Sequence, residues 1–266
     1  MTDSGFGLKF EQVSTIVRPV VQERAWGDVT ECAAQPLYGM YRVRLGPNGA
    51  QPLHFWMRGE GVYYVEEGEV VVRSRDLAGA PTAVRIPLRG VLDAPPGMVH
   101  GLCSRDGATI YMFTSEPLPE PVRVETLEEA DTEAQAALSA PVEAVNGTTF
   151  DVREKYWGRI DSIVSREFVG KRIELRRAGQ SSLEFHVEKA ESYYVHSGRV
   201  KVGLRIGRGE NKSLVLNEGD RFDIPQGLMH MRIGLEDSIL MEVSTPDSDG
   251  DSYLVEDGRT YEHVER

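Results

Sequence analysis

The residues best suited to chemistry lie in two stretches of the second half of the chain. The first, LEFHVEKAESYYVHSG, runs over 183–198 and carries Glu184, His186 and Glu191. The second, GDRFDIPQGLMH, ends at His230. Alternate side chains of a β-strand share a face, so Glu184 and His186 should point to one side, and Glu191 can return there after a tight connection. Two Glu oxygens and two His nitrogens that converge in this way would suit one Zn, Mn, Fe or Ni ion.

The elements that must position these residues are short β-strands. Segments 38–46, 61–74 and 109–115 are rich in Val, Tyr, Ile and Phe with rough alternation. Turn signals built on Pro, Asn and Gly separate them, for example PNG at 47–49 and PPG at 95–97. Many short strands at such spacing favour an all-β barrel or sandwich.

The first half of the chain is repeated in the second half. Three motifs recur at one constant separation of 130 positions, which indicates an internal duplication. The pairs are LHFW (53–56) with LEFH (183–186), VYYVEEGEV (62–70) with SYYVHSGRV (192–200), and PPGMVH (95–100) with PQGLMH (225–230).

Between the copies the composition changes. EPLPEPVRVE is rich in proline, and the following TLEEADTEAQAAL has the composition of an acidic helix that Pro141 then stops. The sequence therefore predicts an N-terminal barrel over 1–117, an acidic and possibly helical linker over 118–146, and a C-terminal barrel over 147–266.

On these motifs the second half resembles a cupin, whose two motifs are G(X)5HXH(X)3,4E(X)6G and G(X)5PXG(X)2H(X)3N. Glu191 is followed after six residues by Gly198, as in the first motif. The second motif is matched by Gly219, Pro225, Gly227 and His230. Its final Asn is replaced by Gly234.

More narrowly, residues 152–245 are similar to the cupin domain of type II phosphomannose isomerases, and the first half resembles it more weakly. The resemblance implies tandem double-stranded β-helix (jelly-roll) barrels, that is, a bicupin. It also implies a divalent transition metal (Zn, Mn, Fe or Ni) in the C-terminal barrel, held by Glu184, His186, Glu191 and His230. Glu184 stands where those isomerases have Gln and dioxygenase-type cupins have His. A second carboxylate favours a harder cation and disfavours a three-histidine site that activates oxygen.

The first barrel departs from the ligand pattern. At the aligned positions it has His54, Trp56, Gly61 and His100, and Glu60 lies one residue from the missing Glu. A pair of histidines binds metal weakly and Trp56 would fill the space that a ligand needs, so the N-terminal barrel is expected to be free of metal.

The other candidate residues surround the C-terminal motifs. Tyr193 alternates onto the ligand side, and Lys201 or Glu188 would be the general base. Basic residues on the flanking strands would hold an anionic substrate, since Arg binds phosphate or carboxylate in a bidentate manner. We select Arg172, Arg176 and Arg205. The alternative is that Tyr193 only packs the barrel wall and that the basic residues lie on solvated strand faces.

Composition bounds the partners. The chain has 266 residues, 40% hydrophobic and 27% charged, and a formal net charge of −12. This charge argues against nucleic acid or an anionic membrane as the main partner. Two cysteines and the absence of a signal-peptide pattern lead us to expect a cytoplasmic protein. The resemblance implies a homodimer.

The leading functional hypothesis is a metal-dependent isomerase of a sugar, sugar phosphate or similar polyhydroxylated small molecule. Two alternatives stay open, because cupin folds serve many reactions. One is an iron-dependent dioxygenase or lyase-type cupin, and the other is a bicupin that binds a small molecule without catalysis.

Overall fold

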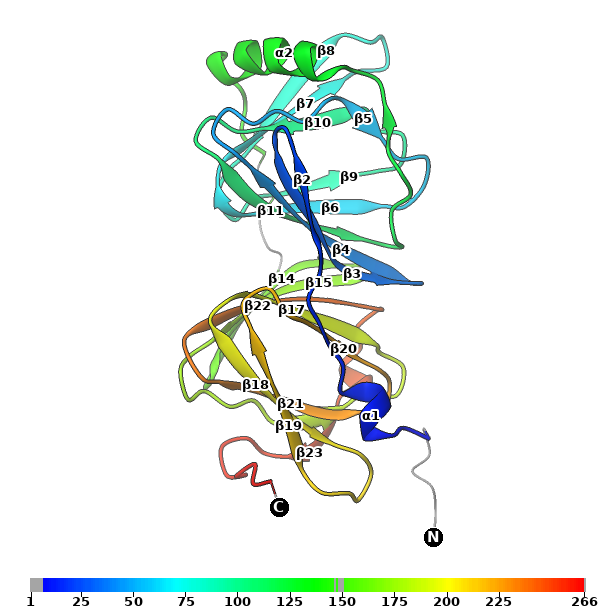
Figure 1. Ribbon diagram of the computed structural model, residues 1–266, viewed down its shortest axis with the longest axis vertical. Helices are drawn as coiled ribbons and strands as arrows, with labels where there is room; N and C mark the ends of the chain where they lie inside the picture. The colour runs from blue at the N-terminus through cyan, green and yellow to red at the C-terminus, as the bar shows by residue number, and fades with distance from the viewer. Residues whose placement is uncertain (1–6, 146, 148–150, 266) are drawn as a thin grey trace. The chain divides into compact units, whose positions relative to one another are not determined.

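The computed structural model describes residues 7–145, 147 and 151–265. The chain divides into two compact units, Val20–Thr149 (the N-terminal unit) and Met1–Pro19 together with Phe150–Arg266 (the C-terminal unit). Figure 1 labels the helices and many of the strands of both units. The predicted boundaries placed the start of the chain in the first barrel, but β1 (Ile16–Val17) pairs with β20 (Arg221–Ile224) of the C-terminal unit.

The N-terminal unit consists of two antiparallel sheets, with strand orders β2-β3-β4-β11-β6-β9 and β12-β5-β10-β7-β8. Its elements are β2 (Val21–Arg24), β3 (Gly27–Gln35), β4 (Tyr38–Leu45), β5 (His54–Phe55), β6 (Gly61–Gly68), β7 (Val70–Arg75), β8 (Pro81–Ile86), β9 (Val91–Ala94), β10 (His100–Cys103), β11 (Ala108–Thr114), β12 (Val122–Arg123) and α2 (Leu127–Ser139).

The C-terminal unit has the same plan, with sheets ordered β1-β20-β17-β22-β15-β14-β13 and β19-β18-β21-β16-β23. Besides β1 and β20 its elements are α1 (Phe10–Val13), β13 (Asp151–Lys155), β14 (Gly158–Ser165), β15 (Val169–Leu175), β16 (Leu183–Phe185), β17 (Glu191–Ser197), β18 (Arg199–Arg205), β19 (Lys212–Asn217), β21 (Met229–Gly234), β22 (Ser238–Ser244), the 3-10 helix η1 (Asp249–Asp251) and β23 (Tyr253–Glu256). The predicted all-β fold of two jelly-roll barrels is confirmed.

Strand registers show that the duplication is structural. In the N-terminal unit His54 lies opposite His100, and in the C-terminal unit Glu184 lies opposite His230. The two pairs are separated by the same 130 positions that separate the sequence motifs. The two barrels therefore share one frame, and residues at this spacing occupy equivalent places.

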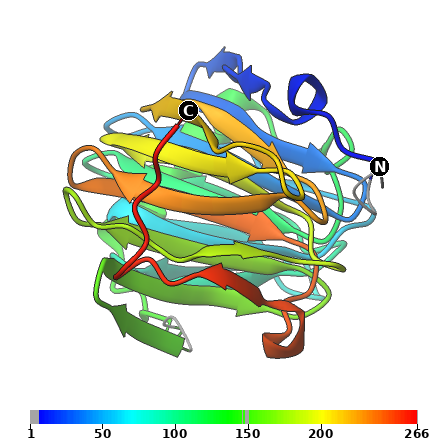
Figure 2. The ribbon, with the colours of Figure 1, turned by 90° about the horizontal axis from the view of Figure 1, so that it is seen from below.

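Alternation along the strands fills each barrel. On β15 of the C-terminal unit, Ile173 and Leu175 join the buried apolar core with Tyr193, Val202 and Leu240. The segment after β23 runs back across the strands of the same unit (Figure 2), where Ser213 and Asn211 bond to it. The C-terminal unit thus contains an apolar cluster, and the polar residues described below line a cavity of the same unit.

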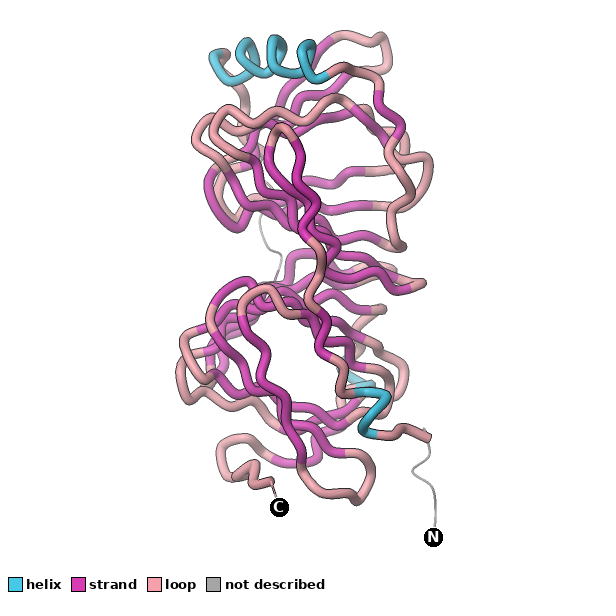
Figure 3. Tube along the Cα trace, in the orientation of Figure 1, coloured by secondary structure: helices cyan, strands magenta, loops and turns pink. Residues whose placement is uncertain are grey.

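Helix α2 lies within the segment predicted as a linker, and it packs on the N-terminal unit (Figure 3). Its Ala130 and Ala134 are buried against Val71 and Cys103. A capping box starts it, in which Thr126 Oγ1 accepts from the Glu129 N–H at 3.2 Å and Glu129 accepts from the Thr126 N–H at 2.8 Å. Within the described ranges, the helices are too short or too polar to cross a membrane.

Candidate metal centre

Three of the four predicted ligands meet inside the C-terminal barrel. Glu184 on β16 and His230 on β21 are direct cross-strand neighbours, and His186 follows β16 by one residue. One potential ligand atom from each lies within 4.8 Å of the others, and among the residues that the structure describes this is the one group of this kind. Two His nitrogens and a carboxylate oxygen form a donor set for a divalent transition metal.

The two imidazoles are oriented by backbone carbonyls. Nδ1 of His186 lies 2.9 Å from the Asp251 carbonyl oxygen, and Nδ1 of His230 lies 3.0 Å from that of Leu228. A carbonyl oxygen only accepts, so each Nδ1 carries a proton, and each ring in its neutral form would offer the Nε2 lone pair to a metal. Nε2 of His230 is buried, makes no hydrogen bond with the described residues, and lies 2.8 Å from Glu191 Oε1. A buried ring nitrogen that makes no hydrogen bond and has a carboxylate beside it fits a metal ligand.

Asp251 in η1 fixes the loop that carries His186. Its carboxylate accepts hydrogen bonds from the backbone N–H groups of Val187 at 2.7 Å and Lys189 at 2.9 Å, and also from that of Glu188. Burial raises the pKa of Asp251, but these three donors outweigh it and hold the pKa below its usual range. The loop is therefore held by a charged, hydrogen-bonded anchor.

Glu191, the fourth predicted ligand, lies beside the group of three and is engaged by other residues. Its Oε1 accepts from Tyr193 Oη at 2.6 Å and lies 2.8 Å from His230 Nε2, while Oε2 is 2.5 Å from Lys189 Nζ. Burial raises the pKa of Glu191, yet Lys189 and His230 bring it well below the ordinary value. Glu191 is thus an ionised carboxylate whose charge Lys189 already neutralises.

A network of buried ions surrounds Glu191. Glu242 on β22 receives Lys171 Nζ at 3.2 Å, Lys189 Nζ at 2.9 Å and Arg232 Nη1 at 3.4 Å. Lys171 also contacts Asp247 at 2.5 Å. Burial alone would lower the pKa of Lys189, but its carboxylate partners raise it, so this side chain keeps its proton.

These residues line a polar cavity of about 510 Å³. Its wall includes six cationic side chains and six carboxylates, which balance in formal charge. The cations are Arg153, Lys155, Lys171, Lys189, Arg232 and Arg259, and the carboxylates are Glu154, Glu184, Glu191, Glu242, Asp247 and Asp249.

The structure does not bring the predicted substrate-binding arginines to this cavity. Arg172 is buried on the other face of β15, where it contacts Asp161 and Glu174. The Arg176 side chain is 65% exposed, and its guanidinium lies 4.0 Å from a carboxylate oxygen of Glu154. Arg205 is held by Asn211, Glu256 and Tyr261. By strand alternation Lys171, rather than Arg172, shares the inward side of β15 with Ile173, and Lys171 lines the cavity.

The predicted catalytic residues also need revision. Lys201 pairs with Glu265 at 2.8 Å and does not line the cavity, so its placement argues against a role as base. Glu188 is exposed and likewise absent from the cavity wall. Tyr193 does reach the site, but its hydroxyl donates to Glu191, and burial raises its pKa well above the ordinary value. Tyr193 therefore positions Glu191.

Sequence reasoning missed Arg232 and Glu242, although a signal exists for each. Arg232 lies two residues after His230 on the same strand, and alternation places both side chains on one face. Glu242 interrupts the apolar run SILMEVS and lies opposite Tyr193. A lone acid within a buried strand requires a charged partner.

The equivalent positions of the N-terminal barrel hold His54, Trp56, Gly61 and His100. A Cβ atom on Gly61 would come within 2.3 Å of the Met112 Cε methyl, so this thioether occupies the space that Glu191 takes in the other barrel. The Trp56 ring centroid lies 4.7 Å from that of His54 and 5.5 Å from that of His100. This arrangement is an aromatic cluster.

Comparison with known proteins gives the class of the C-terminal unit. Residues 164–253, about a third of the chain, match the family model described as Cupin. Two curated proteins of Oryza sativa subsp. japonica are similar over 61 residues: germin-like protein 3-7 at 39% identity and germin-like protein 3-8 at 36%. The matched stretch is 23% of this chain and about a quarter of each relative.

Solved structures support the fold of the whole chain. The oxalate decarboxylase of Lactobacillus farciminis, determined as a formate complex, has a TM-score of 0.67 at 16% identity, covering 89% of this chain and 86% of that one. A mutant of the Bacillus subtilis oxalate decarboxylase has a TM-score of 0.66 at 16% identity, covering 86% and 76%. At such identity the likeness concerns the fold, which is that of a bicupin. The resemblance to phosphomannose isomerases stays a prediction.

Proposed function

We propose that the protein is a metal-dependent enzyme whose reaction takes place in the C-terminal barrel. The observation that carries this proposal is the convergence of Glu184, His186 and the buried His230, whose Nε2 makes no hydrogen bond, beside a polar cavity that the first two residues line. The B. subtilis oxalate decarboxylase is described as having Mn(II) centres, which is consistent with a metal in this fold.

Glu184 and the Nε2 atoms of His186 and His230 would hold the ion, which would polarise a carbonyl or hydroxyl oxygen of the substrate. Asp251 keeps His186 in the required tautomer and place. Lys189 and Tyr193 both retain their protons and direct them at Glu191, so they serve as donors and not as bases. The Glu184 side chain is 24% exposed and presents its carboxylate to the cavity, held by Arg232 at 3.2 Å.

The charges of the wall favour an oxygen-rich anion as substrate. Cationic and anionic side chains balance there, so a divalent ion would leave the cavity with a positive charge of about two. A sugar phosphate or sugar acid fits this charge and the volume of about 510 Å³. The proposed reaction is isomerisation, in which a proton moves between adjacent carbons of the substrate.

The first test is the metal content of protein purified without added metal. We expect about one Zn, Mn or Fe per chain, lost in His186→Ala and in Glu184→Ala. Glu191→Gln tests whether Glu191 is a metal ligand. If Glu191 is only a neighbour of the ligands, the substitution should lower the affinity for the metal without abolishing binding. The matched control is His54→Ala in the other barrel, which should keep the metal. If the wild type holds no metal, even after reconstitution, the proposal of a metal-dependent enzyme is wrong.

A second candidate is an iron-dependent oxygenase, because two histidines and one carboxylate with open positions also suit non-haem Fe(II). Oxygen uptake by the Fe(II)-loaded protein with sugar acids and other small carboxylates would favour this candidate. Conversion of sugar phosphates without oxygen uptake would favour isomerisation.

A further inference from the structure

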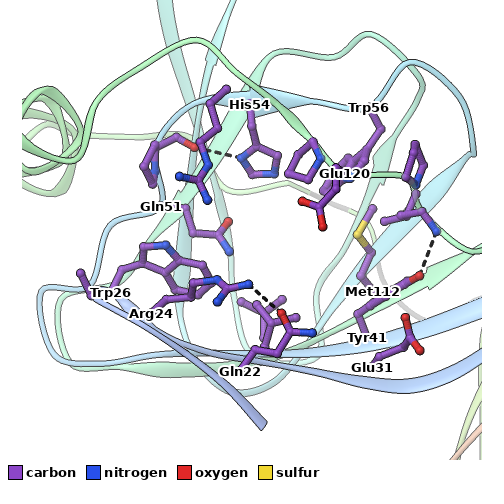
Figure 4. A pocket seen from close by; sticks show the side chains of 18 of the residues that line it. Gln22, Arg24, Trp26, Glu31, Tyr41, Gln51, His54, Trp56, Met112 and Glu120 are labelled. Carbon is purple, nitrogen blue, oxygen red and sulfur yellow. Dashed lines mark hydrogen bonds between the residues drawn. The ribbon is translucent and has the colours of Figure 1, made fainter. Parts of the chain in front are cut away.

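The N-terminal barrel contains a separate cavity of about 280 Å³ with a different lining. Figure 4 shows Trp26, Gln51, His54 and Trp56 around it. Tyr63 on β6 also contributes to the wall. Aromatic rings present flat apolar surfaces, so the cavity suits a ring-shaped ligand.

His54 offers a hydrogen-bond acceptor in this wall. His54 is 8% exposed, and its Nδ1 lies 2.9 Å from the Pro52 carbonyl oxygen, so Nδ1 carries the proton and Nε2 is an acceptor. No described residue donates to His54 Nε2. Burial lowers the pKa of His54, which keeps the ring neutral. By contrast, Nε2 of His100 accepts from Tyr63 Oη at 2.8 Å and is satisfied.

The charges of the lining do not select an ion. Arg24 and Arg123 are balanced by Glu31 and Glu120. Arg24 bonds to Gln22 at 2.7 Å, and Arg123 pairs through its backbone with the strand of His54. The place of a metal ligand is filled by the Met112 methyl. A neutral ligand therefore fits better than an anion, a cation or a metal complex.

We propose that the N-terminal barrel binds a small, uncharged aromatic molecule that carries a hydroxyl or N–H donor. The donor hydrogen-bonds His54 Nε2, and the ring packs against Trp26 and Trp56. This inference is independent of the metal centre, because its residues all belong to the N-terminal unit.

The test compares two probes that differ in one donor. Indole has an N–H group and 1-methylindole lacks it, and both have nearly the same ring and volume. Calorimetric titration of the full wild-type chain should show indole binding about tenfold more tightly, the effect of one hydrogen bond. Indole-3-carboxylate measures the charge preference, and it should bind no better than indole.

The variant His54→Phe keeps an aromatic ring and removes the acceptor, so the difference between the two probes should disappear. His186→Ala in the other barrel is the matched control and should leave indole affinity unchanged. Equal binding of both probes to the wild type, or no binding of either, overturns the proposal. These outcomes need no variant to fold, and the metal content of the wild type is judged separately.

Discussion

The buried charged residues of the C-terminal barrel are replaced together by uncharged residues in the N-terminal barrel. Glu191 and Glu242 correspond to Gly61 and Met112 of the N-terminal unit, at the shared spacing of 130. A buried charge without its partners costs several kcal/mol, whereas an apolar replacement of the whole group is tolerated. The C-terminal barrel therefore has the whole ionic network, and the equivalent described positions of the N-terminal barrel have none of it.

Lys189 is the residue whose loss should affect folding most within this network. Lys189→Met leaves Glu191 and Glu242 buried with less compensation, so we expect a loss of about 3–5 kcal/mol in the free energy of unfolding. Chemical denaturation measures it. Lys201→Met is the control, because the Lys201–Glu265 pair is partly exposed and should contribute about 0–1 kcal/mol. Equal effects of the two substitutions would show that the buried network contributes no more to the free energy of unfolding than a partly exposed ion pair.

His100 should make the N-terminal unit sensitive to acid. Burial, and then the proximity of His54, lower the pKa of His100 to about 4. Its pKa in the unfolded chain is 6.5, so the unfolded state binds a proton first as the pH falls. Stability is complete above about pH 6.5 and is lost down to about pH 4, by about 3 kcal/mol in total.

The variant His100→Gln tests this assignment, because Gln can still accept from Tyr63 but does not titrate. Denaturation midpoints measured between pH 7 and 4 should fall less steeply in His100→Gln than in the wild type. Parallel curves would assign the acid sensitivity to other groups.

Much of the candidate site could be predicted from residue types and spacing. His186 and His230 follow from the motifs, and Glu184 from strand alternation. The substrate-binding residues could not be assigned in the same way, because a run such as Lys171-Arg172 gives no register by itself. The register follows from Ile173 and Leu175, which must face the core, and it places Lys171 inside the barrel.

At the scale of elements, composition indicated the helix but not its packing. The acidic sequence of α2 indicated a linker that could be helical, and in the structure Ala130 and Ala134 form a small-residue face that lies on the N-terminal barrel. Glu125, just before the helix, forms a buried bidentate pair with Arg73 at 2.9 Å for both bonds. The helix is thus attached at its start and along one face.

The capping box gives this attachment a test. Thr126→Ala removes the side chain that accepts from the Glu129 N–H, which should destabilise α2 by about 1 kcal/mol. Hydrogen exchange of the amides in 127–139 should speed up about fivefold while the barrel strands keep their protection. Thr132→Ala is the control, because Thr132 bonds only within the helix, to the Glu128 carbonyl. If both variants exchange alike, the cap does not hold the helix.

At the scale of the whole molecule, the duplication predicted two barrels but not the assignment of the chain's start. β1 contains two residues, too few to give a period, and its pairing with β20 depends on contacts more than 200 positions apart. Arg18 adds an ion pair to Asp220 at 2.9 Å. The sequence alone held no sign that this segment belongs to the second unit.

Two units with one candidate metal centre should respond differently to metal. A ligand that binds only the folded state stabilises it by about 2.7 kcal/mol at one hundred times its Kd. Mn or Zn should therefore raise the Tm of the C-terminal unit by several degrees and leave the N-terminal unit unchanged. Hydrogen exchange at increasing temperature, followed by mass spectrometry, assigns each transition to its own peptides. His186→Ala should abolish the shift.

A shift of both units would have one of two causes: the units unfold as one cooperative body, or the N-terminal barrel also binds metal. The variant His54→Ala decides between them. It removes the response of the N-terminal peptides only if the N-terminal barrel binds metal.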